Sequence, residues 1–569
     1  MKEQENHSKA PRSGTLTAYL LGINDLLKRY EQMKPLSTAC EFPQEALNVL
    51  DISLDPQGES LDVLKEAGPA VIYANHPFGG VEGIILAHIC CALRPDFKLL
   101  ANHMLTIMPA FAPMIIPINV DAKSQRENIK AMRQAIDHVE NGGALGIFPA
   151  GIVSHWQMKE RKIVEPIWQK LIGRLTRLPN TKAIPVHFKG TNSFLFHALG
   201  CIHPFLRTIN LPRELAKRID TSISYEVGRP VDANILPKLV DDSARTAHLR
   251  ARCDALARPT SIMNTVWDIP VASPDASDDL LNTCKAFLEK DTLATEGNFA
   301  VFAVRGSQSL CIMQEIGRLR EETFRLVGEG SGQERDLDKY DNDYEHIVLW
   351  DTVKECIAGA YRVRVFRPEE AHESEEKLYL ASLFDIKAEF YHKCQRSMEL
   401  GRAFIGTEYQ RDYVPLMLLW KGIGRFIVRN NLRTLFGPCS IGLGYTESSV
   451  HILRQLLKEH YWQDELANYA KGKLEPKPFS GPNVPNVQGL DYKTCNRIVN
   501  DLEGDKGLPI LFKHYLQLNG RIAAFHEDQI FGTLDALLVV DLALTPEKIL
   551  LRYMSKEELE DVRASYKSS

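Results

Sequence analysis

The chain has 569 residues, of which 44% are hydrophobic and 25% are charged, and its formal net charge is −5. These are ordinary values for a globular protein, so they exclude disordered, collagen-like and low-complexity chains. The nearly neutral charge argues against a nucleic-acid-binding protein. At roughly 100–200 residues per domain, the length predicts more than one domain.

Three further features bear on the compartment. No apolar run reaches the roughly 18–20 residues needed to span a bilayer. Residues 1–14 lack the apolar segment and the cleavage site of a signal peptide. The 11 cysteines are scattered and form no Cys-x-x-Cys pair, so neither a zinc site nor a disulfide framework is expected. We therefore expect a cytoplasmic protein without a bound metal.

The first half of the chain is predicted to form an α/β layer. Residues 15–34 have the apolar spacing of an amphipathic helix. From residue 70 to about 230, short apolar runs typical of strands alternate with helical stretches. A closing helix is expected over 233–257, and a stretch rich in Pro, Ser and Asp follows at 266–280.

The second half begins a new α/β pattern. We expect a helix over 279–292, a strand over 299–305, a hairpin over 346–366 and a long helix over 411–434. The two halves share no internal repeat. The predicted architecture is therefore two unlike α/β domains, residues 1–270 and 296–569, with a linker at 271–295.

A histidine and a carboxylate follow the first predicted strand of the α/β layer. His76 and Glu82 lie where that strand passes through a Gly-rich turn into a helix. Such a carboxylate can fix the tautomer of the imidazole, which then removes a proton from an attacking hydroxyl. A lone His and Glu are more often structural. Two further motifs favour a functional site, FPAGIVS at 148–154 and IPVHFKG at 184–190.

In this order and spacing, the three motifs resemble the glycerolipid acyltransferase family of the lysophosphatidate type, over roughly residues 60–230. The resemblance implies that His76 is the general base, that Glu82 orients it, and that the acyl thioester is attacked directly. It also implies substrate-binding roles for residues within these motifs: Asn75, Gly80, Phe148, Pro149, Gly151 and Ser154.

This sequence departs from the family pattern where the family binds phosphate. The acid is Glu rather than Asp, and the interval from His76 is one residue longer. Ala150 and Val153 occupy the positions of a glutamate and an arginine, and Asn119 lies in a segment where the family carries another arginine. Without arginine, the guanidinium that binds phosphate with two hydrogen bonds is missing. An inactive domain is one interpretation, but we favour an acyltransferase whose acceptor carries no phosphate.

Residues 159–189 hold eight basic and two acidic residues, interleaved with apolar side chains such as Trp168. Such a basic amphipathic segment suits adsorption to an anionic lipid surface. A solvated helix face is the alternative on charge alone. Because the implied substrate is a lipid, we expect a peripheral protein on the inner face of the cytoplasmic membrane.

A second set of charged residues lies in the C-terminal half: Asp338, Asp341, His346, Arg362, Glu399 and Arg402. In this order they resemble the ornithine N-acyltransferases, relatives of the acyl-homoserine-lactone synthases with an acetyltransferase-like (GNAT-like) fold, over about 300–440. The resemblance implies that Glu399 lies in the cleft between donor thioester and amine, where it positions or deprotonates the amine.

The same resemblance implies roles for the other residues of this set. Asp338 and Asp341 would attract a cationic amino acid, and His346 is a further candidate for substrate binding. Arg362 and Arg402 would organise these carboxylates or bind the carboxylate of the acceptor. Which carboxylate acts as the base stays open.

Four basic residues spaced by four follow: Lys421, Arg425, Arg429 and Arg433. Residues 416–433 contain no acid, whereas a solvated helix usually mixes both signs. Acyl carrier proteins are strongly acidic, so we interpret this stripe as a docking face for one. An ordinary solvated helix is the alternative.

With both halves in one chain, the whole resembles the bifunctional ornithine-lipid synthases. The C-terminal domain would transfer a 3-hydroxyacyl group from an acyl carrier protein, as its phosphopantetheine thioester, to an amino acid such as ornithine, lysine or glycine. The N-terminal domain would then acylate the 3-hydroxyl of the lyso-aminolipid. No tightly bound cofactor is implied. The alternatives are a phospholipid acyltransferase with a degenerate C-terminal half and a non-catalytic, haemolysin-like membrane-binding protein.

Overall fold

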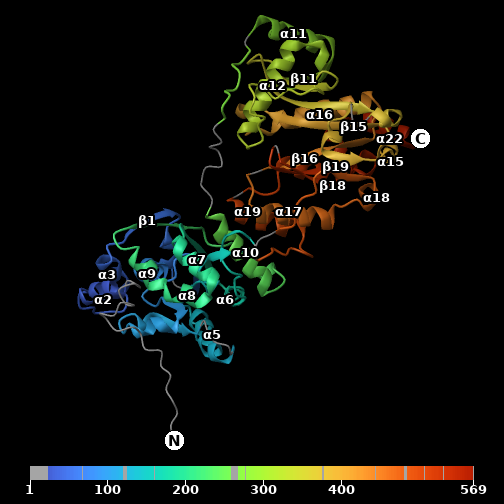
Figure 1. Ribbon diagram of the computed structural model, residues 1–569. Helices are drawn as coiled ribbons and strands as arrows, with labels where there is room; N and C mark the ends of the chain where they lie inside the picture. Colours follow the sequence, from blue (N-terminus) through green and yellow to red (C-terminus); the bar gives the residue numbers. More distant parts are fainter. Residues whose placement is uncertain are drawn as a thin grey trace. The chain divides into compact units, whose positions relative to one another are not determined.

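The structure is a computed structural model that describes residues 23–66, 68–119, 125–158, 160–257, 267–275, 277–373, 377–442, 444–479, 483–504, 506–529 and 531–567. The described residues form two compact units. The first unit comprises residues 23–257 together with 483–504, and the second comprises 267–479 together with 506–567. Figure 1 shows the elements of each unit.

The first unit is built around a mixed seven-stranded sheet in the order β1-β9-β8-β2-β5-β3-β4. Neighbouring strands pair in parallel except for β8 and β9. The central strands β2 and β5 are buried along their whole length, as expected for parallel strands covered on both faces. The strands span Ser53–Gly58 (β1), Ala70–Ala74 (β2), Lys98–Asn102 (β3), Ile115–Ile118 (β4), Ala144–Ile147 (β5), Lys182–Phe188 (β8) and Ser222–Val227 (β9).

Helices and one hairpin complete the first unit. Its largest core cluster joins β2 to apolar residues of α3 and α4, such as Phe42 and Ile85. The hairpin consists of His155–Gln157 (β6) and Lys162–Val164 (β7). The helices span Ile23–Glu31 (α2), Glu41–Val49 (α3), Val81–Cys91 (α4), Gln125–Glu140 (α5), Leu171–Leu175 (α6), Phe194–Ile202 (α7), Pro204–Ile209 (α8), Leu211–Ala216 (α9), Asp242–Ala255 (α10) and Tyr492–Glu503 (α19).

Helix α19 belongs to the first unit, although it lies more than two hundred residues beyond the other elements of that unit. Asp501 of α19 accepts a bond from His248 Nε2 at 3.0 Å, and Arg252 Nε lies 3.2 Å from the same carboxylate oxygen. Both partners are buried residues of α10. The structure therefore divides the chain differently from the predicted domains 1–270 and 296–569, and a fragment that ends near residue 270 would lack α19.

The second unit contains an eight-stranded sheet in the order β10-β11-β12-β13-β15-β16-β19-β18. All neighbouring strands are antiparallel except β15 and β16, which pair in parallel over only three residues each. The strands span Thr292–Glu296 (β10), Phe299–Arg305 (β11), Glu345–Asp351 (β12), Cys356–Phe366 (β13), Ser397–Ile405 (β15), Thr434–Ile441 (β16), Arg521–Asp528 (β18) and Thr533–Asp541 (β19); Phe384–Ile386 (β14) pairs separately with Ala470–Gly472 (β17).

Helices α12 and α16 lie on opposite faces of this sheet. Phe302 and Val348 belong to one core cluster with Ile312 of α12, whereas a Cβ at Gly422 of α16 would lie 2.4 Å from Val301. Side chains alternate along a strand, so Val301 and Phe302 face opposite ways. The helices span Asp278–Lys290 (α11), Leu310–Arg325 (α12), Leu380–Leu383 (α14), Ala388–Lys393 (α15), Tyr413–Arg429 (α16), Glu447–His460 (α17), Asp464–Ala467 (α18), Ile510–Gln517 (α20), Glu547–Leu550 (α21) and Lys556–Lys567 (α22).

Two expectations from the sequence need correction. The predicted linker at 271–295 contains helix α11, whose Leu280 and Cys284 are buried in the core of the second unit. The basic segment 159–189, predicted to be amphipathic, is divided in its described residues among the β6–β7 hairpin, the short α6 and strand β8, and its Trp168 is only 2% exposed. The predicted helix at 15–34 lies partly outside the described residues, which start within it at Ile23.

Among the described residues, no helix is long and apolar enough to cross a membrane. The described side chains also include no group of three or more His, Cys, Asp or Glu residues placed to hold a metal ion.

Candidate active sites

The first candidate site lies at the carboxyl end of β2, where the chain turns into α4. His76 Nδ1 lies 2.8 Å from Glu82 Oε1, and 17% of the His76 side chain is exposed while Glu82 is fully buried. A carboxylate beside Nδ1 favours the tautomer that carries its proton there, which leaves Nε2 as the proton acceptor. The longer interval and the longer acidic side chain therefore still bring the two groups together.

Glu82 also holds the turn between them. Its Oε1 accepts hydrogen bonds from the backbone N–H groups of Phe78 at 2.9 Å and Gly79 at 2.6 Å, and its Oε2 accepts one from Gly80 at 3.0 Å. Burial by itself would raise the pKa of Glu82, but His76 and backbone donors outweigh it and the pKa is lowered. Glu82 is therefore held as a carboxylate beside the imidazole.

The FPAGIVS motif packs against His76, as its place in the sequence predicts. The Phe148 ring stacks on the imidazole with centroids 4.7 Å apart. Ser154 N donates to His76 O at 2.8 Å. Gly151 has a φ of +65° and closes the turn with a bond to Phe148 O at 3.0 Å, while Pro149 O accepts a bond from Gln169 N at 2.9 Å. The structure thus gathers the residues of both motifs around one histidine.

Asn75 and Gly80 have contacts within the protein itself. The Asn75 amide donates to Phe188 O at 3.0 Å and accepts from Phe188 N at 2.7 Å, which ties the end of β2 to the end of β8. Gly80 N donates to Glu82, as described above. Substrate contact by either residue stays a prediction.

Glu165 is a further residue of this site that the sequence analysis did not single out. Its Oε1 accepts a hydrogen bond from His76 N at 2.6 Å, and its Oε2 accepts one from Trp168 Nε1 at 3.0 Å. Arg250 Nη2 lies 3.8 Å away. Burial raises the pKa of Glu165 to about 7 although Arg250 opposes the shift. In the sequence, only its position before Pro166 in a stretch with few acids sets Glu165 apart.

A residue of the C-terminal half supports this loop. Asn483 Oδ1 accepts hydrogen bonds from Trp168 N at 3.0 Å and from Arg250 Nη1 at 3.3 Å. The segment 483–504 therefore reaches the loop that holds the backbone of His76, and it does so within the first unit.

The positions where the family pattern places phosphate-binding charge are apolar and buried. Ala150 is 3% and Val153 is 6% exposed. Lys189 of the third motif is paired with Glu226 at 3.1 Å. The nearest cation described at the turn is Arg218, whose guanidinium lies 4.3 Å from the centroid of the Phe78 ring and donates to Thr191 O at 2.6 Å. The structure gives Arg218 no carboxylate at ion-pair distance among the described residues.

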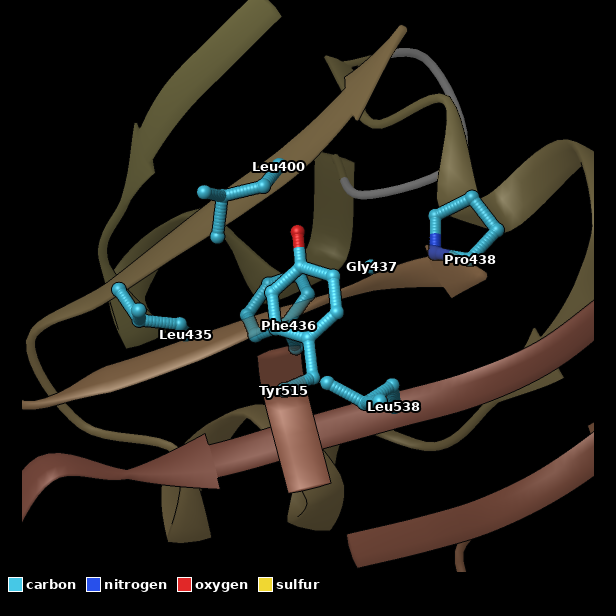
Figure 2. Close-up of a pocket in the computed structure, with 7 residues that line it drawn as sticks. All are labelled: Leu400, Leu435, Phe436, Gly437, Pro438, Tyr515 and Leu538. Carbon is cyan, nitrogen blue, oxygen red and sulfur yellow. The ribbon is translucent and has the colours of Figure 1, made fainter. Parts of the chain in front are cut away.

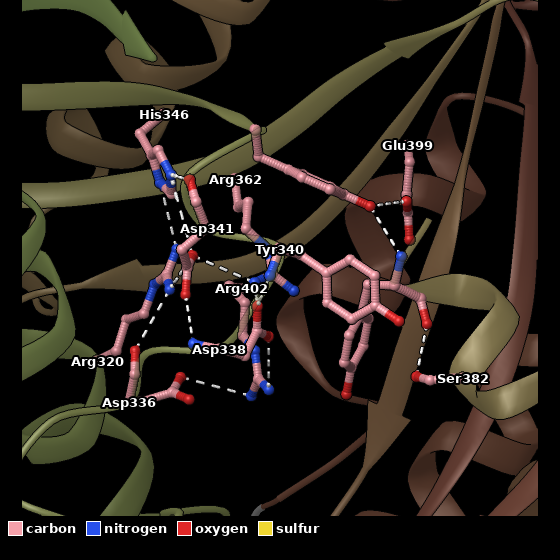
Figure 3. A network of polar contacts seen from close by, with 12 residues as sticks. Arg320, Asp336, Asp338, Tyr340, Asp341, His346, Arg362, Ser382, Glu399 and Arg402 are labelled. Atoms are coloured by element: carbon pink, nitrogen blue, oxygen red, sulfur yellow. Dashed lines mark hydrogen bonds and ion pairs between the residues drawn. The ribbon is translucent and has the colours of Figure 1, made fainter. Parts of the chain in front are cut away.

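The second candidate site lies on the α12 face of the eight-stranded sheet (Figure 3). The register of the antiparallel strands sets His346 of β12 opposite Arg362 of β13, and Arg364 of β13 opposite Glu399 of β15. Strand pairing therefore gathers most of the residues that the sequence predicted together.

Arg362 is the centre of a buried ion-pair network. Its Nη1 lies 2.7 Å from Asp338 Oδ1 and 3.2 Å from Asp341 Oδ1, and Asp341 also pairs with Arg320 at 2.8 Å. Burial alone would raise the pKa of Asp341, but the two guanidinium groups hold it far below its usual range. Arg362 is 1% exposed, and its Nε and Nη2 find no hydrogen-bond partner among the described residues. Both of these nitrogen atoms are buried.

A β-bulge turns Arg402 towards the same network. The register between β13 and β15 shifts between Ala360 and Arg362, and Arg402 has a φ of +48°. Such a left-handed conformation is costly for a residue other than glycine, and bulges are known to redirect side chains at functional sites. Arg402 Nη1 lies 3.4 Å from Asp336, which the sequence analysis did not include.

Glu399 lies apart from these arginines and is joined to two tyrosines. Its carboxylate accepts a hydrogen bond from the Tyr344 hydroxyl and another from Leu380 N at 2.7 Å. The Tyr344 oxygen in turn accepts a bond from Tyr379 N at 2.8 Å. Burial raises the pKa of Glu399 to about 7, although Tyr344 and Arg362 lower it. A carboxylate with a pKa near neutrality is suited to remove a proton at physiological pH.

His346 is fully buried beneath the network. Its Nε2 lies 3.1 Å from Asp341 O and its Nδ1 lies 3.3 Å from Arg320 Nη2. Burial and the Arg320 charge lower its pKa to about 3, so it is neutral at physiological pH. The structure therefore places the predicted substrate-binding residue His346 where it reaches a substrate only through Arg320 and Asp341.

Beyond their three paired residues, β15 and β16 leave a small pocket between them (Figure 2). It is mostly apolar, and its lining comes from both strands and their neighbours: Leu400, Leu435, Phe436, Gly437, Pro438, Tyr515 and Leu538. Glu399 immediately precedes the lining residue Leu400, and because side chains alternate along a strand, the two side chains point to opposite faces of the sheet.

The predicted docking stripe is fully paired. Lys421 pairs with Glu296, and Arg425 pairs with Glu558 at 2.9 Å. Arg429 pairs with Asp291, and Arg433, which follows the end of α16, pairs with Asp541 at 2.8 Å. The acids missing from the helix come from other elements of the unit. Between 38% and 58% of these basic side chains stays exposed.

Comparison with known families supports this two-part organisation. Residues 20–217 match the family described as "Acyltransferase", and residues 319–421 match the "Acetyltransferase (GNAT) domain" family. The two matches confirm the predicted fold class of an acyltransferase domain followed by a GNAT-like domain.

Similar proteins have related activities. A glycine N(alpha)-acyltransferase of Phocaeicola vulgatus is 30% identical over 241 residues, which cover 40% of this chain and 73% of that protein. A lyso-glycine lipid O-acyltransferase of the same species is 27% identical over 34% of this chain and 68% of its own length. An L-ornithine N(alpha)-acyltransferase of Rhizobium meliloti is 25% identical over 48% of this chain and 92% of its own length. The chain therefore belongs to the family of amino-acid N(alpha)-acyltransferases, and it is a bifunctional acyltransferase that joins an acyltransferase domain to a GNAT-type domain.

Proposed function

We propose that this enzyme makes an aminolipid of the ornithine-lipid type by two successive acyl transfers. The GNAT-type domain acylates the α-amine of an amino acid with a 3-hydroxyacyl group from an acyl carrier protein. The acyltransferase domain then acylates the new 3-hydroxyl group. The order follows from the chemistry, because the hydroxyl that accepts the second acyl chain arrives with the first.

In the N-acylation step, we assign the free donors of Arg362, together with Arg402, to the carboxylate of the amino acid. Asp338 attracts its ammonium group. Glu399 takes one proton from the ammonium, and the neutral amine nitrogen then bonds to the thioester carbonyl carbon. The carbon–sulfur bond breaks, and a second proton passes from the nitrogen to the departing sulfur, so that the carrier's phosphopantetheine leaves as the thiol.

In the O-acylation step, His76 Nε2 removes the proton from the 3-hydroxyl as its oxygen attacks the second thioester. Glu82 stabilises the imidazolium that forms. The imidazolium then returns the proton to the departing thiolate, so no covalent acyl-enzyme is needed. We assign Arg218 to the carboxylate of the lyso-aminolipid, which carries no phosphate.

The observation that carries the proposal is the combination of sites in one chain. The His76–Glu82 pair has the geometry to activate a hydroxyl, while the buried, apolar Val153 replaces an arginine that would bind phosphate. The names of the relatives, which act on glycine, ornithine and lyso-glycine lipid, point to the same pair of reactions.

Expression of the full chain in a host without aminolipids tests the proposal. Mass spectrometry of the lipid extract should reveal a new ninhydrin-positive lipid that contains no phosphorus. Separate growth with labelled glycine, ornithine and lysine then identifies the amino acid. A change confined to phospholipids would contradict the proposal and favour a phospholipid acyltransferase.

A further inference from the structure

The first unit exposes apolar side chains on three neighbouring elements, α7, α8 and the β6–β7 hairpin, which together we call the apolar surface. On α7 and α8, Phe194 is 86%, Ile202 is 74% and Phe205 is 62% exposed. On the β6–β7 hairpin, which α7 contacts, Met158 is 73% exposed. The other exposed apolar residues of these elements are Trp156, Ile163, Leu195, Leu206 and Ile209. Soluble proteins rarely expose so many large apolar side chains together without a partner.

Two segments of the apolar surface, the hairpin and α7, each follow a residue that is hydrogen-bonded to the turn that carries His76. Ser154, whose N–H bonds to His76 O at 2.8 Å, directly precedes strand β6. Asn192 donates its side-chain amide to Phe78 O at 3.0 Å, and α7 begins two residues later. A partner bound to the apolar surface would therefore lie next to the turn that carries His76.

The exposed charged side chains around this surface are mostly basic. Residues 194–210 contain no Asp or Glu. Their single arginine, Arg207, is only 9% exposed and so leaves the outer face apolar. On the hairpin side, Arg161, Lys162 and Lys170 are exposed against one exposed acid, Glu160. Apolar side chains flanked by a net positive charge are typical of proteins that insert shallowly into an anionic bilayer.

We propose that the apolar surface inserts into the face of an anionic phospholipid bilayer and so places His76 at the lipid–water boundary. The inference rests on the proposed function, because a lyso-aminolipid acceptor keeps its acyl chain in the bilayer while its 3-hydroxyl lies near the headgroups. The enzyme then reaches this hydroxyl without extracting the lipid into water. Phe194, Phe205 and Met158 enter the acyl region, and the hairpin cations contact the phosphates.

Vesicle co-sedimentation of the full chain tests the inference. The vesicles contain either phosphatidylethanolamine with phosphatidylglycerol or phosphatidylcholine alone. The test variant is Phe194→Asp with Phe205→Asp. The control is Leu310→Asp with Ile510→Asp, which changes side chains of similar exposure, 76% and 69%, in the second unit. We expect the test variant to lose binding by at least about a hundredfold, since each buried aromatic side chain contributes about tenfold or more. The control should bind like the parent.

Two further measurements distinguish a failure of the membrane role from a failure of the proposed function. Binding of the parent to the phosphatidylglycerol vesicles should weaken with salt and with Arg161→Glu and Lys162→Glu. O-acylation of a detergent-dispersed acceptor should persist in the Phe194, Phe205 variant, which shows that its fold and chemistry are intact. If this variant binds vesicles like the control, the membrane role is wrong and the function stands. The membrane role is equally wrong if the parent forms a dimer that only the test variant dissociates. If no protein transfers an acyl group in detergent, the proposed function itself fails.

Discussion

Glu165 Oε1 accepts a hydrogen bond from the backbone N–H of His76 at 2.6 Å, although 89 residues separate the two in sequence. The candidate base is thus held from two sides: Glu82 fixes its ring and Glu165 fixes its backbone. This relationship makes Glu165 a positioning residue for O-acylation.

Replacement of Glu165 should therefore impair one activity selectively. We expect Glu165→Ala to lower kcat for O-acylation by about 10–100-fold, because a small displacement of a catalytic group is costly. N-acylation should be unchanged. Glu165→Gln, which keeps an acceptor oxygen, should recover part of the loss. Glu160→Ala, an exposed acid of the same segment, is the control.

The free energy of unfolding should also depend on the protonation of Glu165. Its pKa is about 7 in the folded chain against an ordinary value of 4.5, so the folded state binds the proton more tightly. Its contribution to the free energy of unfolding should then fall as pH rises from about 4.5 to about 7. Glu165→Gln should remove that part of the pH dependence. Denaturant unfolding at several pH values measures it, and an identical pH dependence in parent and variant would contradict this assignment.

Glu399 predicts a pH dependence for the other activity. Since a general base must be deprotonated, N-acylation should rise with pH around a midpoint near 7, which is the pKa of Glu399. Tyr344→Phe removes a hydrogen bond that lowers this pKa, so the midpoint should move to higher pH. Glu399→Gln should cost about 10²–10⁴-fold in kcat.

The pH profile of kcat at saturating amino acid separates a base from a structural residue. Tyr553→Phe, which removes the hydroxyl of another partly buried tyrosine of the same unit, should leave the midpoint in place. A Tyr344→Phe enzyme with an unchanged midpoint would remove Glu399 from the role of base.

Arg218 should set the affinity for the acceptor of the second step. Arg218→Ala removes a charge-assisted bond of about 1.5–3 kcal/mol, which predicts a rise in KM for the lyso-aminolipid of about 10–100-fold with a smaller change in kcat. Arg218→Lys keeps the charge but loses the planar contact with Phe78, so it should recover only part of the affinity. An unaltered KM in both variants would place the acceptor carboxylate elsewhere.

The same domain should discriminate against a phosphorylated acceptor. In a competition assay of the full chain, we expect a preference of about 10²–10⁴-fold for lyso-aminolipid over lysophosphatidate, because the two arginines that would make charge-assisted contacts to phosphate are replaced at Val153 and Asn119. Equal turnover of the two acceptors would show that another residue binds phosphate.

The docking stripe needs a variant that separates carrier binding from folding. Arg425 is the most exposed of the four cations and pairs with Glu558. Arg425→Glu should raise the apparent KM for the acyl carrier protein and reduce its dependence on salt. Adding Glu558→Arg restores the internal ion pair with the two charges exchanged between the positions. If this double variant regains the parent KM, the stripe serves folding and the docking role is wrong.

The sequence predicts the two sites to different extents. His76 and Glu82 could be found because one short segment holds both, and the paired strands 346–366 bring His346 close to Arg362 through local register. Glu165 could not be found in this way, since it reaches His76 only after a hairpin folds back. The position of α19 in the first unit was equally hidden, because it depends on contacts such as Asp501 with His248 that leave no periodic pattern.

The docking stripe shows a second limit of the sequence, while its docking role stays a prediction. Its helix lacks acids in sequence, yet Glu296, Asp291 and Asp541 supply them from strands or loops distant along the chain. A charge pattern along one helix does not reveal such partners.

The most direct test of the central claim is a reconstitution with purified full-length enzyme, amino acid and 3-hydroxyacyl carrier protein, followed by mass spectrometry of the lipids. The parent should form a mono-acylated and then a di-acylated aminolipid. His76→Ala should accumulate the mono-acylated product, and Glu399→Gln should form neither product but should still acylate added lyso-aminolipid. If His76→Ala abolishes both products, or if Glu399→Gln still forms them, the assignment of one acyl transfer to each domain is contradicted.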